Sequence, residues 1–276
     1  MTLPVRRASR RRPPVVRRAS AGIAARRIGA ALVAVAALAA IFGAATSPAF
    51  ELRQLDVEGA RYTPTSAVDA ALGLAATPHP NVFVLDTARL RRALLALPAV
   101  TDARLRVELP DRLVVRLAER QPILVWASSN ERWLVDVEGV VMGPATPGDP
   151  ATAGLPVFAD DRSGRRPLAP GDTLDATDLA VARRLGALTP KLLGSRAATF
   201  SFEITDADGF TVSSVPRGWL AVFGMYTATL RSPDLIPAQV QCLASLLAQV
   251  GERKVASVYL FPEGDQCGTF TSRSGP

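Results

Sequence analysis

From Ile28 to Phe50 the chain contains 23 residues without a charge, IGAALVAVAALAAIFGAATSPAF. As a helix, such a stretch spans about 34 Å, slightly more than the hydrocarbon core of a bilayer, which is about 30 Å thick. No acidic residue precedes it, whereas nine arginines do: Arg6, Arg7, Arg10, Arg11, Arg12, Arg17, Arg18, Arg26 and Arg27. The positive-inside rule therefore predicts a cytoplasmic N-terminus and an exported remainder. We expect a disordered tail over residues 1–27 and a transmembrane helix over residues 28–49.

Three other interpretations of this region are weaker. A cleaved signal peptide would use Ser47-Pro48-Ala49 as its small-residue site, but the apolar run is long and the site contains a proline. A helix buried in a protein core would not need the arginine flank. A sequence pI near 10.3 suggests a nucleic-acid partner. The basic residues, however, are concentrated before the apolar run, and the exported part is mildly acidic. We therefore expect no nucleic-acid partner.

Both cysteines of the chain, Cys242 and Cys267, lie in the exported part. An oxidising compartment permits a disulfide between them, and two buried thiols are the equal alternative. Their spacing is not that of metal ligands, and the single histidine, His79, lies in a loop sequence, TPHPN. We therefore expect neither a zinc site nor any other metal or cofactor.

Residues 50–98 predict one strand followed by two helices. The segment FELRQLDVEG alternates apolar and polar side chains as a half-buried strand does. In the first helix, Thr63 is expected as N-cap, Pro64 as the first helical residue and Gly73 as the stop. The second helix begins after Asp86, is terminated by Pro98, and repeats apolar residues at i, i+4 and i+7: Leu90, Leu94 and Leu97.

Residues 101–117 predict a β-hairpin. Alternation places Ala103, Leu105, Val107 and Leu109 on one face of the first strand, against charged residues on the other. Pro110-Asp111 supplies the turn, and a returning strand contains Leu113, Val115 and Leu117. The order over residues 50–120 is therefore strand, helix, helix, strand, strand.

This order and its residues resemble the FtsQ-type POTRA domain of the bacterial cell-division proteins called FtsQ or DivIB. The matching positions are Asp86, Leu97, Pro98, Val100, Ala103, Pro110, Leu113, Val115, Glu119, Arg120 and Pro122, and in the next segment Leu134, Val135, Asp136 and Gly139. The resemblance implies an α+β protein: cytoplasmic tail, single transmembrane helix, POTRA domain over 50–120 and a β-rich domain over 121–262. A polar C-terminal tail over 263–276 is expected after it.

The second domain is expected to consist mostly of strands, with two helices in residues 175–193 and 237–250. The strand sequences are PILVW, RWLVDV, VVM, ATFSFEI, FTVSS, WLAVF and KVASVYLF. Inward positions of the first helix are predicted to be Leu179, Ala182, Leu185, Leu188 and Leu192. Those of the second are Val240, Leu243, Leu246, Leu247 and Val250.

No motif for catalysis is found in the sequence. Ser-x-x-Lys, Gly-x-Ser-x-Gly and phosphate-binding glycine loops are missing, so we expect no enzyme activity and no small-molecule substrate. Asp160-Asp161 is interpreted as a solvated pair in an arginine-rich loop. Asp206 and Asp208 beside Gly209 fit a hairpin turn better than a calcium loop, which needs more oxygen ligands.

A binding role has more support, because the predicted strand 255–261 comes last and is expected at a sheet edge. The resemblance implies that this strand and the residues after it receive FtsB- and FtsL-like coiled-coil proteins. The expected partner-binding residues are Val255, Ser257, Tyr259, Phe261 and Phe270; the alternative is an internal core strand. Many relatives have Asp-x-Arg in this strand, whereas this chain has Tyr259-Leu260-Phe261.

The sequence therefore predicts a non-enzymatic, single-pass scaffold of bacterial cell division in the inner membrane at the septum, linking early and late septum-assembly proteins. Two other classes remain. POTRA domains also serve as exported chaperone or secretion modules, but those chains continue into a β-barrel, and this sequence has no series of ten-residue alternating strands. An exported hydrolase would need a nucleophile and a base, which the sequence does not provide.

Overall fold

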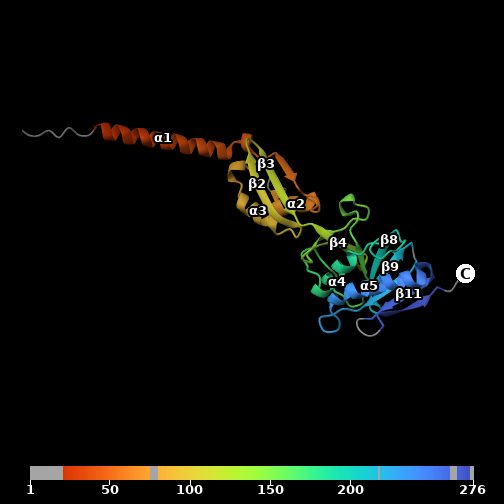
Figure 1. Cartoon of the computed structure of the whole chain (residues 1–276). Helices are drawn as coiled ribbons and strands as arrows, with labels where there is room; N and C mark the ends of the chain where they lie inside the picture. Colours follow the sequence, from red (N-terminus) through yellow and green to blue (C-terminus); the bar gives the residue numbers. More distant parts are fainter. Residues whose placement is uncertain (1–20, 75–79, 217, 262–265, 274–276) are drawn as a thin grey trace, which may run out of the picture.

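The computed structural model describes residues 21–74, 80–216, 218–261 and 266–273 of the chain (Figure 1). His79 and residues 1–20 of the predicted N-terminal tail lie outside these ranges. Helix α1 (Ala21–Thr46) includes the predicted anchor, and its segment Arg26–Thr46 is long and apolar enough to cross a membrane. The prediction of disorder up to residue 27 is wrong for its last seven residues. Their sequence, AGIAARR, contains three alanines and two arginines, which are good helix formers.

The first folded unit after α1 has the predicted order of elements. Its sheet consists of β1 (Gln54–Glu58), β2 (Val100–Glu108) and β3 (Arg112–Glu119), in the order β1-β3-β2. Strand β3 pairs parallel with β1 and antiparallel with β2. Helices α2 (Thr65–Leu72) and α3 (Thr87–Leu95) contribute Val68, Leu72, Leu90 and Leu94 to a core shared with the sheet.

The predicted helix signals at Asp86 and Gly73 are confirmed, but α3 ends at Leu95, so Leu97 lies after the helix, and one predicted cap is not formed. The Asp86 carboxylate accepts the N–H of Arg89 at 2.9 Å, and Gly73 ends α2 in the left-handed conformation. Thr63 does not cap α2: Pro64 occupies the cap position, and no side chain of the described residues caps the helix. The reason is that Thr63 lies in the preceding turn, where its backbone N–H donates to Glu119 on β3 at 2.8 Å.

The second unit contains a nine-stranded sheet in the order β12-β11-β10-β9-β8-β7-β4-β5-β6. Seven of its strands match the predicted segments: β4 (Pro122–Ser128), β5 (Glu131–Asp136), β6 (Val141–Pro144), β8 (Thr199–Thr205), β9 (Gly209–Val215), β10 (Leu220–Gly224) and β11 (Val255–Leu260). The sequence did not predict β7 (Val157–Asp160) or β12 (Gly268–Ser272). Strand β7 is only four residues long, and β12 has one large apolar side chain, so neither produces a clear alternation.

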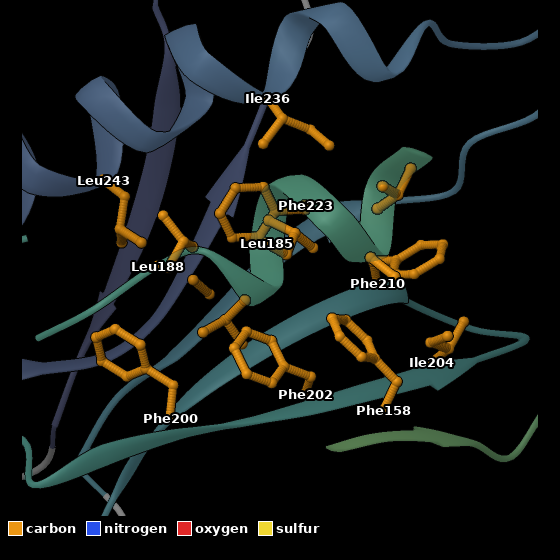
Figure 2. Close-up of a cluster of buried hydrophobic side chains, with 14 of the residues drawn as sticks. Phe158, Leu185, Leu188, Phe200, Phe202, Ile204, Phe210, Phe223, Ile236 and Leu243 are labelled. Atoms are coloured by element: carbon orange, nitrogen blue, oxygen red, sulfur yellow. The ribbon is translucent and has the colours of Figure 1, made fainter. Parts of the chain in front are cut away.

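Helices α4 (Ala176–Gly186) and α5 (Ile236–Leu246) supply the apolar side chains that face the aromatic residues of this sheet (Figure 2). Leu185 and Leu243 point toward Phe202, Phe223 and their neighbours. The prediction that Leu192 faces inward is wrong, because α4 ends at Gly186 and Leu192 is 61% exposed. Pro190 cannot continue a helix, and the loop that contains it buries Leu193 instead.

Candidate partner-binding edge of the C-terminal sheet

Strand β11 is not at the edge of the sheet. It pairs parallel with β10 on one side and antiparallel with β12 on the other. The expectation that residues 255–261 form the edge is therefore wrong, and the predicted polar tail contains the true edge strand. Polar side chains did not prevent this pairing, because a β-ladder is made by backbone groups, which every non-proline residue provides.

A disulfide attaches the edge strand to the helix layer. Cys242 of α5 and Cys267, which directly precedes β12, are bonded with their Cα atoms 5.8 Å apart. Of the two alternatives that the sequence left open, the structure has the disulfide. At the two ends of the ladder, the Phe261 N–H donates to the Cys267 carbonyl (3.0 Å) and the Arg273 N–H to the Lys254 carbonyl (2.8 Å). Strand β12 is therefore held in place at both ends.

The register shows which backbone groups of β12 face outward. In an antiparallel ladder, directly opposed residues alternate between hydrogen-bonded and non-hydrogen-bonded pairs. Because Phe261 and Cys267 form a hydrogen-bonded pair, the pairs Tyr259/Thr269 and Ser257/Thr271 are of the same kind. Phe270, opposite Val258, then directs its own N–H and C=O away from β11. These are the groups that an added strand would bond.

The five predicted binding residues have different environments. Val255 is fully buried in the core and cannot contact a partner in the folded protein. Ser257 is half-buried, and its hydroxyl lies 2.6 Å from that of Thr271. Tyr259, Phe261 and Phe270 are exposed by 43%, 39% and 40%. Opposed residues share a face of a sheet, so Phe270 lies on the face of Val258 and Tyr259 on the other.

The composition of β12 is unusual for an edge strand. Proteins normally protect exposed edges with charges, proline or a covering segment. Residues Gly268–Ser272, GTFTS, contain no charge and no proline. The opposite edge, β6, is only four residues long, ends in Pro144, and is covered by residues 171–173: the Val141 N–H donates to the Asp172 carbonyl at 2.9 Å. Within the part of the chain that the structure describes, the β12 edge is therefore the one that this sheet leaves open to a strand.

A second group of side chains joins the first and second units, and only the resemblance pointed to it in the sequence. Glu119, at the end of β3, accepts the backbone N–H groups of Arg61, Tyr62 and Thr63 at 2.7–2.8 Å. Arg120 donates to the carboxylates of Asp136 and Glu138, both at 2.7 Å. Consecutive residues thus fix the β1–α2 turn of the first unit and the β5–β6 turn of the second.

The pairing of opposite charges explains why Arg120 lies against Asp136 and Glu138 where the two units meet. The carboxylate of Asp136 is almost fully buried, and it also accepts the N–H groups of Glu138 and Val140. Hydrogen bonds from Arg120 to Glu138 and Asp136 raise the pKa of Arg120 above its usual value. A buried carboxylate needs such a partner, because an unpaired buried charge costs several kcal/mol.

The aspartates of the second unit only partly follow the sequence interpretation. Asp160 is not solvated: it is buried and pairs at 2.7 Å with Arg162, which also bonds Asp178 of α4. Burial alone would lower the pKa of Arg162, but hydrogen bonds to Asp160 and Asp178 outweigh it and raise the pKa. Asp206 and Asp208 lie in the β8–β9 turn, as expected. The described residues contain no cluster of three or more metal-ligating side chains.

Comparison with known proteins agrees with this architecture. Residues 50–120 match the family model described as "POTRA domain, FtsQ-type". The chain is 33% identical over 182 residues to the "Cell division protein FtsQ" of Chloroflexus aggregans and 32% identical over 183 residues to that of Chloroflexus aurantiacus. Each alignment covers 66% of this chain and 64% of the relative. A relative of the same name from Anaeromyxobacter is 33% identical over 162 residues, covering 53% of this chain and 54% of the relative.

The order of strands and helices in residues 50–120, together with the family match, defines the chain as a POTRA-domain protein. More narrowly, the domain is of the FtsQ type, and over about two thirds of its length the chain is similar to proteins named as cell division protein FtsQ. It spans a little under two thirds of the length of the curated relatives that it matches.

Proposed function

We propose that this protein is a non-enzymatic, single-pass membrane scaffold of bacterial cell division. In this proposal residues 1–27 are cytoplasmic, α1 crosses the inner membrane, and the POTRA and β-rich units stand outside it at the division septum. The protein would link early and late septum-assembly proteins by binding them, without a cofactor. The observation that carries the proposal is the match of residues 50–120 to the FtsQ-type POTRA model, combined with relatives named as division proteins.

We further propose that the partners include FtsB- and FtsL-like coiled-coil proteins, which add a strand to the β12 edge. The uncharged sequence of β12 and the outward N–H and C=O of Phe270 support this mode of binding. Main-chain hydrogen bonds would give affinity, and alternate side chains would give specificity. Phe270 lies beside the incoming strand, and Tyr259 and Phe261 one strand further in.

Depletion of the protein in its own bacterium tests the cellular role. We expect filamentous cells with incomplete septa, and a fluorescent fusion to the N-terminus that gathers at mid-cell. In the same strain, an epitope-tagged FtsB-like protein should co-purify with the full chain from solubilised membranes. Normal division during depletion, with the fusion spread evenly over the envelope, would contradict the proposal. Capture of outer-membrane clients in place of division proteins would favour a chaperone role.

A further inference from the structure

Three exposed apolar side chains gather at one end of the POTRA unit. Phe83 and Val84 are 52% and 65% exposed on a single 3-10 turn, η3 (Val82–Val84), and Leu109 is 61% exposed at the β2–β3 turn. Within the described part of residues 50–120 they are the only large apolar side chains with such exposure. Single exposed apolar residues are common, but a group of them at one place indicates a contact surface.

Backbone hydrogen bonds bring the two segments together. The Leu52 N–H donates to the Pro80 carbonyl, next to η3, and the Arg53 N–H donates to the Asp111 carbonyl in the hairpin turn, both at 2.9 Å. Residues 52 and 53 therefore lie between the two segments. The rings of Phe50 and Phe83 meet edge to face with their centroids 5.0 Å apart, which continues the apolar surface toward α1.

The same end of the unit is attached to the last turn of α1. The side-chain amide of Asn81 donates to the carbonyl of Ala44 at 2.9 Å and to that of Ser47 at 3.3 Å. Ala44 still belongs to the apolar segment Arg26–Thr46. The loop that contains Phe83 and Val84 consequently lies level with the last turn of the apolar helix, and α1 enters the POTRA unit at this end (Figure 1).

We propose that Phe83, Val84 and Leu109 form a lipid-contact surface that enters the headgroup region on the outer side of the bilayer spanned by α1. This inference rests on the membrane anchoring in the proposed function. Position favours lipid over a protein partner, because a surface level with the final turn of a spanning helix meets headgroups before anything else. Aromatic and aliphatic side chains are the usual anchors at that depth.

The charges nearby indicate the kind of lipid. Arg53 donates to the Pro48 carbonyl and lies near Glu51, and Glu108, which precedes Leu109, lies 3.7 Å from both Arg106 and Arg112, so these charged side chains are paired with opposite charges. Insertion of this surface into a bilayer therefore depends on its apolar side chains and does not require negatively charged headgroups. Vesicles of phosphatidylcholine are a sufficient probe. The opposite end of the unit, at Glu119 and Arg120, leads to the second domain, which is directed away from α1 (Figure 1).

Spin labels at single introduced cysteines test the depth of this surface. The native Cys242 and Cys267 are bonded to each other, so Val84→Cys or Leu109→Cys provides the one reactive thiol. Leu230→Cys is a matched control, because Leu230 is 67% exposed on the second domain. The full chain is inserted into phosphatidylcholine vesicles, and collision rates with oxygen and with a water-soluble nickel chelate are compared. We expect the ratio of oxygen to nickel collisions at residues 84 and 109 to exceed that at residue 230 at least threefold.

Three results overturn the inference, and they differ in what else they overturn. If the chain resists alkaline extraction but either label gives the ratio found at residue 230, the lipid-contact surface is wrong and the anchor stands. If alkaline extraction releases the chain, the anchor fails, and the surface that depends on it fails too. Protection that appears in native membranes and not in pure lipid assigns the surface to a protein partner, which also overturns the inference.

Discussion

The two folded units each present an open edge strand to solvent, β2 in the POTRA unit and β12 in the second. Strand β2 has four charged side chains on its outer face: Asp102, Arg104, Arg106 and Glu108. They form ion pairs with one another and with Arg91 of α3. Strand β12 has no charged residue. An arriving strand would have to displace or desolvate the charges of β2, whereas at β12 it meets threonine, serine and one phenylalanine.

The comparison shows that both units have an edge strand with unpaired backbone groups, but only β12 lacks the charged side chains that would oppose an added strand. Both strands have outward backbone groups, so geometry alone would allow pairing at either. The charged side chains of β2 oppose the addition of a strand there, whereas β12, which has none, stays available for pairing. The disulfide supports this difference, because it keeps β12 in register, and an edge strand that detached would move the docking site one strand inward, to β11.

The sharpest test of the edge assignment is Ser257→Pro in β11. Ser257 is paired on both sides, with Leu220 of β10 and Thr271 of β12, so proline removes a ladder donor inside the sheet. We expect the free energy of unfolding to fall by about 3 kcal/mol or more. Chemical denaturation of the full chain in detergent, followed by tryptophan fluorescence, measures this. An unchanged midpoint would mean that β12 is not paired as described and that β11 is the edge after all.

Loss of the disulfide should have the next largest effect. Cys242→Ser with Cys267→Ser removes a cross-link over a sequence separation of 25, which is worth about 3 kcal/mol in the chain-entropy model. We expect faster amide hydrogen exchange in residues 266–273, with the POTRA unit unchanged as an internal control. Equal exchange of β12 in both proteins would show that the ladder alone holds the edge strand.

A smaller effect is expected from Phe270→Pro, since it acts on binding and leaves the ladder to β11 intact. The outward N–H is lost and the ring obstructs an added strand, so affinity for an FtsB-like protein should fall about tenfold, equivalent to about 1.4 kcal/mol. Phe270→Ala is the control, because it removes the ring and keeps the N–H. Isothermal titration of both variants separates the backbone and side-chain contributions. Undiminished binding by the proline variant would exclude strand addition at β12.

The sequence predicted the POTRA unit better than the edge. Leu90 and Leu94 repeat at helical spacing, and Asp86 satisfies a helix N-terminus, so local patterns determine these elements. Residues 268–272 have no apolar alternation, and their strand exists because β11 supplies a ladder and Cys242 a tether. The prediction for Asp160 was wrong for a similar reason. Arg162, its partner, is held in place by Asp178, which is a neighbour of both only in the folded chain.

The smallest effect on stability is expected where the POTRA edge loses its protection. Arg104 and Arg106 are exposed, and their ion pairs with Asp102 and Glu108 are of the surface kind, worth about 0–1 kcal/mol. Arg104→Thr with Arg106→Thr should therefore shift the free energy of unfolding by less than about 1 kcal/mol. Threonine favours strands and removes two charges from an edge of nine residues, so we expect new concentration-dependent self-association.

Analytical ultracentrifugation of the full chain in detergent measures that association. Arg61→Thr is a control for the loss of positive charge, because Arg61 lies in the turn before α2 and outside the sheet. The double variant should sediment as a concentration-dependent mixture, and the control as the wild type. If the double variant associates no more than the wild type, charge is not what prevents strand pairing at the β2 edge. The contrast between the two edges would then have to come from their twist or length, and the uncharged sequence of β12 would no longer argue for partner binding.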